Sequence, residues 1–143
     1  MSDSYISPPL TPELHCRDIK VSLPFYINVL GFKILYQRPE EGFAMLEYQG
    51  GHLMLDQIYT STAEATGRNW LSGPIEYPYG RGINLQIMSN EVDAHYRRVQ
   101  ESGAPVFLPM EEKWYRSNNI ELGNRQFIVL DPDVYAALCT RPT

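Results

Sequence analysis

The sequence has 143 residues, of which 43% are hydrophobic and 20% are charged, a balance typical of a globular protein. That length allows one well-buried core and is too short for two ordinary domains. The net charge is −5 at pH 7, and Arg97-Arg98 is the one pair of adjacent basic residues, so we expect no nucleic-acid partner. This charge favours cationic ligands only weakly.

Sequence signals for a membrane or for export are not found. No apolar run approaches the length of a transmembrane helix, and the first residues, MSDSYISPP, lack the basic and apolar regions of a signal peptide. Cys16 and Cys139 lie far apart with no CxxC spacing, so we expect buried thiols and no disulfide. The sequence therefore predicts a cytoplasmic protein without a membrane partner.

The first half of the chain predicts a strand, a helix and then three strands. The opening strand is PELHCR, at residues 12–17. In the helix that follows, Asp18 or Ser22 is placed to cap the start and Gly31 to end it. Pro24 fits only a helix that starts late, because proline is tolerated in a first turn and not in an interior. The three strands are expected at residues 32–38, 43–49 and 52–58.

The last two of these strands flank Gly50-Gly51, which predicts a two-residue hairpin loop. This register pairs Met45 with Asp56 and places Glu47, His52 and Asp56 on one face of the hairpin. These three residue types can bind a metal ion, but they are spread too far along the strands to hold one ion without a third element. An exposed polar face is the ordinary interpretation.

The second half repeats the order of the first. A strand at residues 82–89 precedes a helix at 90–103, and strands follow at 105–116, 125–131 and 134–140. A β-α-β-β-β unit that occurs twice predicts a single α+β domain over residues 1–143, with units at about 10–58 and 82–140.

The connection between the units, residues 59–81, is long for a loop within a compact domain, and such loops are often binding loops or lids. It contains Trp70, Tyr77 and Tyr79. Trp70 is therefore a candidate for ligand contact, and the alternative is a tryptophan that covers the core.

Alternation in the opening strand of each unit separates two faces. Leu14 and Cys16, with their counterparts Leu85 and Ile87, are expected to point toward the helices. The other face has a polar lining, formed by Glu13, His15, Asn84 and Gln86. This lining suits a ligand-binding cleft, and a hydrogen-bonded buried cluster is an equal alternative.

Two segments resemble the vicinal oxygen chelate superfamily, which includes glyoxalase I, extradiol dioxygenases, fosfomycin-resistance enzymes and bleomycin-resistance proteins. They are RDIKVSLPFYINVLGF, residues 17–32, and RQFIVLDPDVY, residues 125–135, in which Val134 replaces the usual glycine. The resemblance spans about residues 10–140 and implies two tandem β-α-β-β-β units forming cupped mixed sheets.

The resemblance also implies where metal ligands lie in the enzymes of this superfamily. The first-strand positions fall near Thr11 and Asn84, and the last-strand acids fall on Leu55 and Leu138. Leucine cannot bind an ion, and Thr or Asn is a poor substitute for His. We therefore expect no metal and no other cofactor, so that the Lewis-acid chemistry of those enzymes is not expected here.

Metal-free members similar to this chain are mainly binding proteins. The resemblance thus predicts no catalytic residues and a homodimer of the bleomycin-resistance type, which sequesters a bulky aromatic ligand, with cationic compounds as candidates. Phe43 and Trp114 match the ring-stacking aromatics of such proteins, and Trp114 can alternatively cover the core. The predicted ligand-binding residues are Glu13, His15, Phe43, Leu55, Trp70, Asn84, Gln86 and Trp114. The alternative is a metal-dependent lyase or dioxygenase with an atypical ligand set drawn from Glu13, His15, Glu47 or Asp56.

Overall fold

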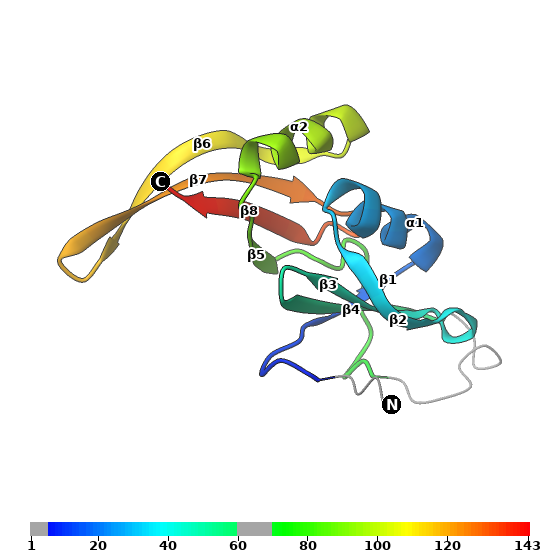
Figure 1. Cartoon of the computed structure of the whole chain (residues 1–143). Coiled ribbons are helices and arrows are strands. Elements are labelled where there is room, and N and C mark those ends of the chain that lie inside the picture. Colours follow the sequence, from blue (N-terminus) through cyan, green and yellow to red (C-terminus); the bar gives the residue numbers. More distant parts are fainter. Residues whose placement is uncertain (1–5, 60–69) are drawn as a thin grey trace, which may run out of the picture. The chain divides into compact units, whose positions relative to one another are not determined.

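A computed structural model describes residues 6–59 and 70–143 of the chain. The chain divides into two compact units, Met1–Glu76 and Tyr77–Thr143, and each contains one four-stranded mixed sheet with its own helix (Figure 1). The predicted α+β fold with two β-α-β-β-β units is confirmed. Within the described ranges, no helix has the length and apolar character needed to cross a membrane.

The first unit forms a sheet with the strand order β1-β4-β3-β2, in which β1 runs parallel to β4 and the other neighbours are antiparallel. Its elements are β1 (Glu13–Cys16), α1 (Ile19–Pro24), the π-helical turn η1 (Phe25–Val29), β2 (Lys33–Arg38), the 3-10 turn η2 (Pro39–Glu41), β3 (Phe43–Tyr48) and β4 (Gly51–Gln57).

Helix α1 begins at Ile19, so the prediction of a late start was wrong. Asp18 is the cap, since its carboxylate accepts a hydrogen bond from the backbone N–H of Lys20 at 3.0 Å. Pro24 is the last residue of α1, and the chain then changes to the π-helical turn, where the Leu30 N–H donates to the Phe25 carbonyl at 3.1 Å. Proline at this junction does not interrupt a continuous α-helix.

The loop of the β3–β4 hairpin is Gln49-Gly50, one residue earlier than predicted. Both residues have positive φ, and the Glu47 carboxylate accepts a hydrogen bond from the Gly50 N–H at 2.6 Å. Phe43 consequently lies opposite Asp56, a shift of two residues from the predicted register. Because side chains alternate with a period of two, a two-residue shift leaves the predicted faces unchanged.

The second unit has the strand order β5-β8-β7-β6, with β5 parallel to β8. Its elements are β5 (Asn84–Met88), α2 (Val92–Ser102), β6 (Val106–Ser117), β7 (Ile120–Leu130) and β8 (Ala136–Pro142). Strand β7 begins five residues earlier than predicted. The β6–β7 hairpin therefore continues past the end of β8 as a long two-stranded arm, visible in Figure 1 in yellow and orange.

Each sheet buries one face beneath its own helix, which we call the helix-covered face. In the first unit this face holds Leu14, Cys16, Ala44, Leu46, Leu53 and Leu55, all of which are buried. In the second unit Phe127, Val129, Ala137 and Cys139 lie beneath Val92 and Val99 of α2. The predicted alternation of the opening strands is confirmed within each sheet, since Leu14 and Cys16 are buried while Asn84 and Gln86 are exposed.

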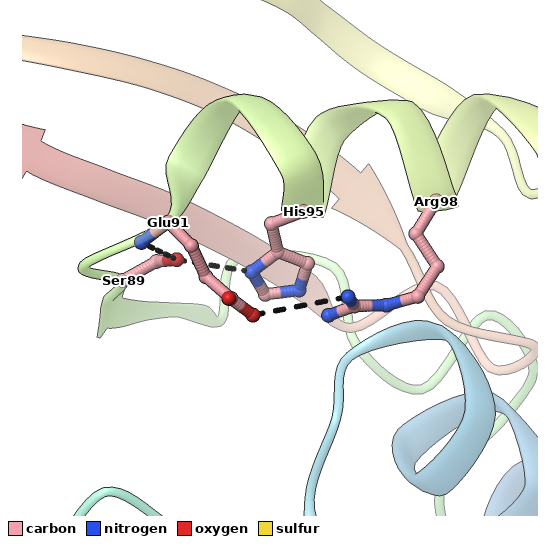
Figure 2. A network of polar contacts seen from close by, with 4 residues as sticks. All are labelled: Ser89, Glu91, His95 and Arg98. Atoms are coloured by element: carbon pink, nitrogen blue, oxygen red, sulfur yellow. Dashed lines mark hydrogen bonds and ion pairs between the residues drawn. The ribbon is translucent and has the colours of Figure 1, made fainter.

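A polar network links the start of α2 to its middle (Figure 2). The Ser89 hydroxyl accepts a hydrogen bond from the Glu91 N–H at 3.3 Å and lies 3.4 Å from Nδ1 of His95. Glu91 and Arg98 form an ion pair at 3.9 Å. His95 is completely buried and packs edge-on against Phe127. Burial, with a smaller contribution from the nearby Arg98 charge, lowers the pKa of His95 to about 4.

This lowered pKa predicts acid sensitivity of the fold. The unfolded chain binds a proton at His95 near the ordinary pKa of 6.5, whereas the folded chain does so only near pH 4. The contribution of neutral His95 to the free energy of unfolding is therefore complete above about pH 6.5. As the pH falls toward 4, the protein loses about 2 to 3 kcal/mol of stability from this residue. Urea unfolding between pH 4 and 7.5 should show a weaker pH dependence for His95→Asn than for the native chain. Equal slopes for the two proteins would contradict the assignment.

The turn between β7 and β8 contains a strained valine. The Asp131 carboxylate accepts hydrogen bonds from the N–H groups of Asp133, at 2.8 Å, and Tyr135, at 2.9 Å. This arrangement holds Val134 at φ +70°, in the left-handed region where a β-branched residue is disfavoured. The glycine expected here from the sequence resemblance would adopt the same backbone without strain.

Replacing Val134 by glycine should therefore stabilise the protein. Relief of the left-handed strain contributes about 1 to 2 kcal/mol, and the greater freedom of glycine in the unfolded chain removes part of it, which leaves a gain of about 1 kcal/mol. The urea midpoint of Val134→Gly measures the change. Asn118→Gly is the matched control, because Asn118 at φ +56° belongs to a residue type that tolerates this region. A less stable Val134→Gly protein would show that the side chain contributes more by packing than it costs in strain.

Candidate ligand-binding site

The candidate site lies on the face of the first sheet that is opposite to α1, which we call the first polar face. On this face four strands form a row of neighbouring side chains, in the order His15, Asp56, Phe43 and Arg38. Glu13 precedes His15 by two residues on β1 and so points to the same side. The sheet thus brings together residues from positions 13 to 56 of the sequence.

Glu13, His15 and Asp56 form a compact cluster of half-buried groups. One donor atom of each lies within 4.8 Å of a donor atom of the other two. Burial raises the pKa of the Asp56 carboxyl to about 6, and the hydrogen bond and charge of Glu13 act in the same direction. Burial also lowers the pKa of His15, against the opposing effect of Asp56. The lowered pKa favours the neutral imidazole at pH 7, which is the form that binds metal ions.

Aromatic and cationic groups border the cluster. The Arg38 guanidinium lies 4.2 Å from the centre of the Phe43 ring and makes a cation–π contact with it. The Nε of Arg38 donates a hydrogen bond to the Glu41 carboxylate at 2.8 Å. Tyr36 lies 6.0 Å from Phe43, ring centre to ring centre. Phe43 is only 7% exposed and Tyr36 is 37% exposed, so Tyr36 is the more accessible ring on this face.

Leu55 does not lie with these residues. It pairs with Leu14 and Ala44 on the helix-covered face and is 0% exposed, so a ligand-binding role does not fit its position. Glu47 is also separate from the cluster, because it accepts the Gly50 N–H and pairs with Lys33 at 3.6 Å. Of the four residues in the atypical ligand set, Glu13, His15 and Asp56 are brought together and Glu47 is not.

In the second sheet the face opposite to α2 has a different character. Asn84 and Gln86 are exposed there, and their neighbours on β8 are Ala136 and Leu138. The residues described in this unit contain no group of three His, Cys, Asp or Glu side chains that could hold a metal ion. Gln86 and Asn84 can offer hydrogen bonds to a ligand but no charge.

Trp114 lies on the β6–β7 arm, on the same side of the ribbon as Arg125, which bonds to Asp93 of α2. Its ring covers Gly123 on the neighbouring strand, and a Cβ at Gly123 would come within 2.8 Å of the ring. Even so, Trp114 is 57% exposed. Register places it on the opposite side of the sheet from Asn84 and Gln86, so these three predicted residues do not share one surface.

Tyr115 occupies the side of the arm that Trp114 does not. Its hydroxyl accepts a hydrogen bond from the Gln126 amide at 2.6 Å, and that amide also donates to Glu111 at 2.9 Å. Gln126 neighbours Thr140 on β8, which neighbours Met88 on β5. Tyr115 is therefore the arm's aromatic residue on the face of Asn84 and Gln86.

Trp70 is 63% exposed and directly follows residues 60–69, which lie outside the described part of the chain. It belongs to the first unit. This exposure argues against the alternative in which Trp70 covers the core.

Sequence reasoning missed Tyr36 and Arg38 as site residues and named Asp56 only within the alternative. Strand β2 contains a bulge between Ile34 and Tyr36, which reverses the expected alternation and turns Tyr36 and Arg38 to the first polar face. No simple period in the sequence marks such a bulge. The identity of the β1 neighbour of Asp56 likewise depends on a pairing between distant residues.

Comparison with known proteins places this fold in a family. The sequence model of the Glyoxalase/Bleomycin resistance protein/Dioxygenase superfamily matches residues 10–136, and the chain belongs to that superfamily. Bleomycin resistance proteins from Geobacillus stearothermophilus and Staphylococcus aureus are 26% identical to it over 133 residues, covering 85% of this chain and 87% of theirs.

Solved structures agree with this assignment at the level of the fold. TioX from Micromonospora sp. ML1 has a TM-score of 0.68 at 23% identity and covers 96% of this chain and 100% of its own. A glyoxalase/bleomycin resistance protein/dioxygenase from Nocardioides has a TM-score of 0.64 at 24% identity, covering 98% of this chain and 87% of its own.

Metal-dependent members of the superfamily imply a metal at the four positions considered above, and the residues present do not fit it. Leu55 is buried on the helix-covered face, and Leu138 and Asn84 offer no carboxylate or imidazole. These four residues therefore cannot supply the metal-dependent chemistry of those members. What the first polar face can do chemically is hold a positively charged group against Glu13 and Asp56 with aromatic surface beside it.

Proposed function

We propose that this protein is a small-molecule binding protein of the bleomycin-resistance type, which acts in the cytoplasm and holds its ligand without a metal at the superfamily's four ligand positions. The ligand is a bulky aromatic compound with a cationic group. The observation that carries the proposal is the half-buried carboxylate pair of Glu13 and Asp56, beside the aromatic residues Phe43 and Tyr36.

Charge supports a cationic group in the ligand. Burial is the largest cause of the raised pKa of Asp56, and the nearby Glu13 carboxyl adds to it through a hydrogen bond and through charge repulsion. A ligand cation placed between them would relieve this repulsion and would gain two charge-assisted hydrogen bonds. The cost of removing the ligand cation from water is smaller at a half-buried site than in the core.

Apolar surface supports an aromatic portion. The half-buried Met54 occupies the row next to Phe43 and Asp56, the buried Met45 lies beside it, and Tyr36 ends that row on β2. Thioethers adapt to irregular ligand shapes, and an aromatic ring contributes contact area with few rotatable bonds. A ligand that stacks on Phe43 must displace Arg38 from the ring, so Tyr36 provides the direct stacking surface.

The ligand prediction concerns Glu13 and Tyr36. In calorimetry with bleomycin and a panel of planar cationic drugs, in buffer containing EDTA, at least one compound should bind. Tyr36→Ala should weaken its binding by about 1 to 3 kcal/mol, the cost of losing an aromatic anchor. Glu13→Gln should weaken it less, and chiefly at low salt, because its contribution is electrostatic.

Glu47→Gln is the matched control, since Glu47 lies on the same face but is bonded to Gly50 and Lys33. It should leave affinity unchanged. The urea midpoint of every variant separates binding from folding.

Trp114→Ala tests the arm in the same assay. A loss of affinity equal to that of Tyr36→Ala would contradict the assignment of the ligand to the first polar face. Normal binding by both Tyr36→Ala and Glu13→Gln would exclude this face.

We further propose that the protein is a homodimer. The tip of the β6–β7 arm is two-stranded, because β8 pairs with β7 only as far as Asn124. It carries four apolar side chains that are 42–57% exposed, namely Trp114, Tyr115, Ile120 and Leu122. Tyr115, Ile120 and Leu122 share one side of the ribbon, and Trp114 lies on the other. A two-stranded ribbon is marginal by itself, and exposed apolar side chains on both of its sides favour an interface with a second copy.

Changing the arm should therefore change assembly. Ile120 and Leu122 share one side of the ribbon, so Ile120→Lys with Leu122→Lys adds two charges to one patch. Sedimentation should show a dimer for the native chain at micromolar concentration and a dimer weakened at least about tenfold in the double variant. Val21→Lys, at an exposed apolar residue of α1, is the control and should leave the dimer intact. A native chain that sediments as a monomer would overturn the proposal.

A further inference from the structure

The cluster of Glu13, His15 and Asp56 has a second chemical capacity besides negative charge. It joins one imidazole to two carboxylates, with one donor atom of each within 4.8 Å of the others. Within the two described ranges, no other three His, Cys, Asp or Glu side chains come together in this way. The geometry points to a binding site for one divalent transition-metal ion, held by Glu13, His15 and Asp56.

The backbone already sets the three ligands in place. Glu13 and His15 are two residues apart on β1, so they project from the same side of the sheet, and Asp56 is the direct partner of His15 on β4. Metal–ligand bonds of about 2.0 to 2.2 Å require donor atoms roughly 3 to 3.5 Å apart. Side-chain rotations can bring the three donors from 4.8 Å to this spacing without movement of the strands.

The donor set decides the kind of ion. Imidazole suits zinc, iron, nickel and copper, whereas carboxylates are also good ligands for manganese. A magnesium or calcium ion prefers oxygen ligands alone, so one histidine disfavours both. Three protein ligands leave coordination positions for water. The ions expected to bind are therefore Zn²⁺ and the other divalent transition metals, with Mn²⁺ the weakest of them.

The surroundings favour a bound cation. Among the charged groups that act on Asp56, Arg38 is the nearby fixed cation, and it is already engaged by Glu41 and by the Phe43 ring. Its single charge is shared between these contacts, so the two clustered carboxylates keep a local negative charge that a divalent ion would neutralise.

This site differs from the ligand set inferred from the sequence resemblance. All three ligands belong to the first unit, and none is Thr11, Leu55, Asn84 or Leu138. The inference replaces the expectation, drawn from the sequence, that the chain binds no metal. It stands apart from the proposed function, because drug binding is measured in EDTA and metal binding is measured without a drug.

The test uses the full chain, stripped with EDTA and dialysed into metal-free buffer at pH 7.5. Titration calorimetry with ZnCl₂ should show saturable binding of one ion per chain. Co²⁺ as a spectroscopic probe should give visible d–d absorption that appears with the same stoichiometry. His15→Ala and Asp56→Asn should each weaken Zn²⁺ binding by more than about tenfold, since even an outer-shell partner of a metal ligand contributes that much.

Two control variants separate this site from adventitious histidine binding. His52→Ala removes a histidine on the same face of β4, and Glu47→Gln removes a carboxylate of β3 that is already bonded. Both should bind Zn²⁺ as the native chain does. Circular dichroism and the urea midpoint confirm that each variant is folded. No saturable binding by the native chain, or binding lost in His52→Ala but retained in both His15→Ala and Asp56→Asn, would overturn the inference.

Discussion

The parallel pairing of β1 with β4 is the contact on which the first unit and its candidate site both depend. The Met54 N–H donates to the Pro12 carbonyl at 2.9 Å, and the Ile58 N–H donates to the Cys16 carbonyl at the same distance, so the pairing is fixed at both ends of β1. This register buries Leu14 and Cys16 beneath α1 and turns Glu13 and His15 toward Asp56. A slip of one residue would bury a carboxylate and an imidazole in the core and expose two apolar side chains, at a cost of several kcal/mol. The core therefore holds the site in register.

The second unit repeats this pairing with different side chains. Strand β5 lies parallel to β8, and Gln86 is the partner of Leu138 at the place where the first sheet has charged residues. Its helix-covered face is apolar like that of the first unit. Repetition of the fold thus preserves the positions that point away from the helix and does not preserve their chemistry. The charged candidate site is confined to one of the two sheets.

Two histidines show why burial does not by itself identify a site. Burial lowers the pKa of both His15 and His95. His95 packs against Phe127 and lies within hydrogen-bonding distance of Ser89, a setting that serves the stability of α2. His15 lies beside two carboxylates at the surface of a sheet, where a ligand or an ion can reach it. The neighbours of each imidazole, more than its burial, separate a structural role from a binding role.

Local patterns in the sequence determined the repeated units, the glycines that end the helices and the face on which most strand residues lie. These features depend on side-chain period and on positive φ at Gly31 and Gly103, which neighbouring residues largely decide. Only the tertiary structure decided which strand lies beside Asp56, because β1 and β4 are about 40 residues apart and no local period reports their register. It also decided the bulge that turns Tyr36 and Arg38 toward the site, and the burial of Leu55. A binding site formed across strands depends on pairings between distant residues, and those pairings are selected by burial of the whole apolar face of the sheet.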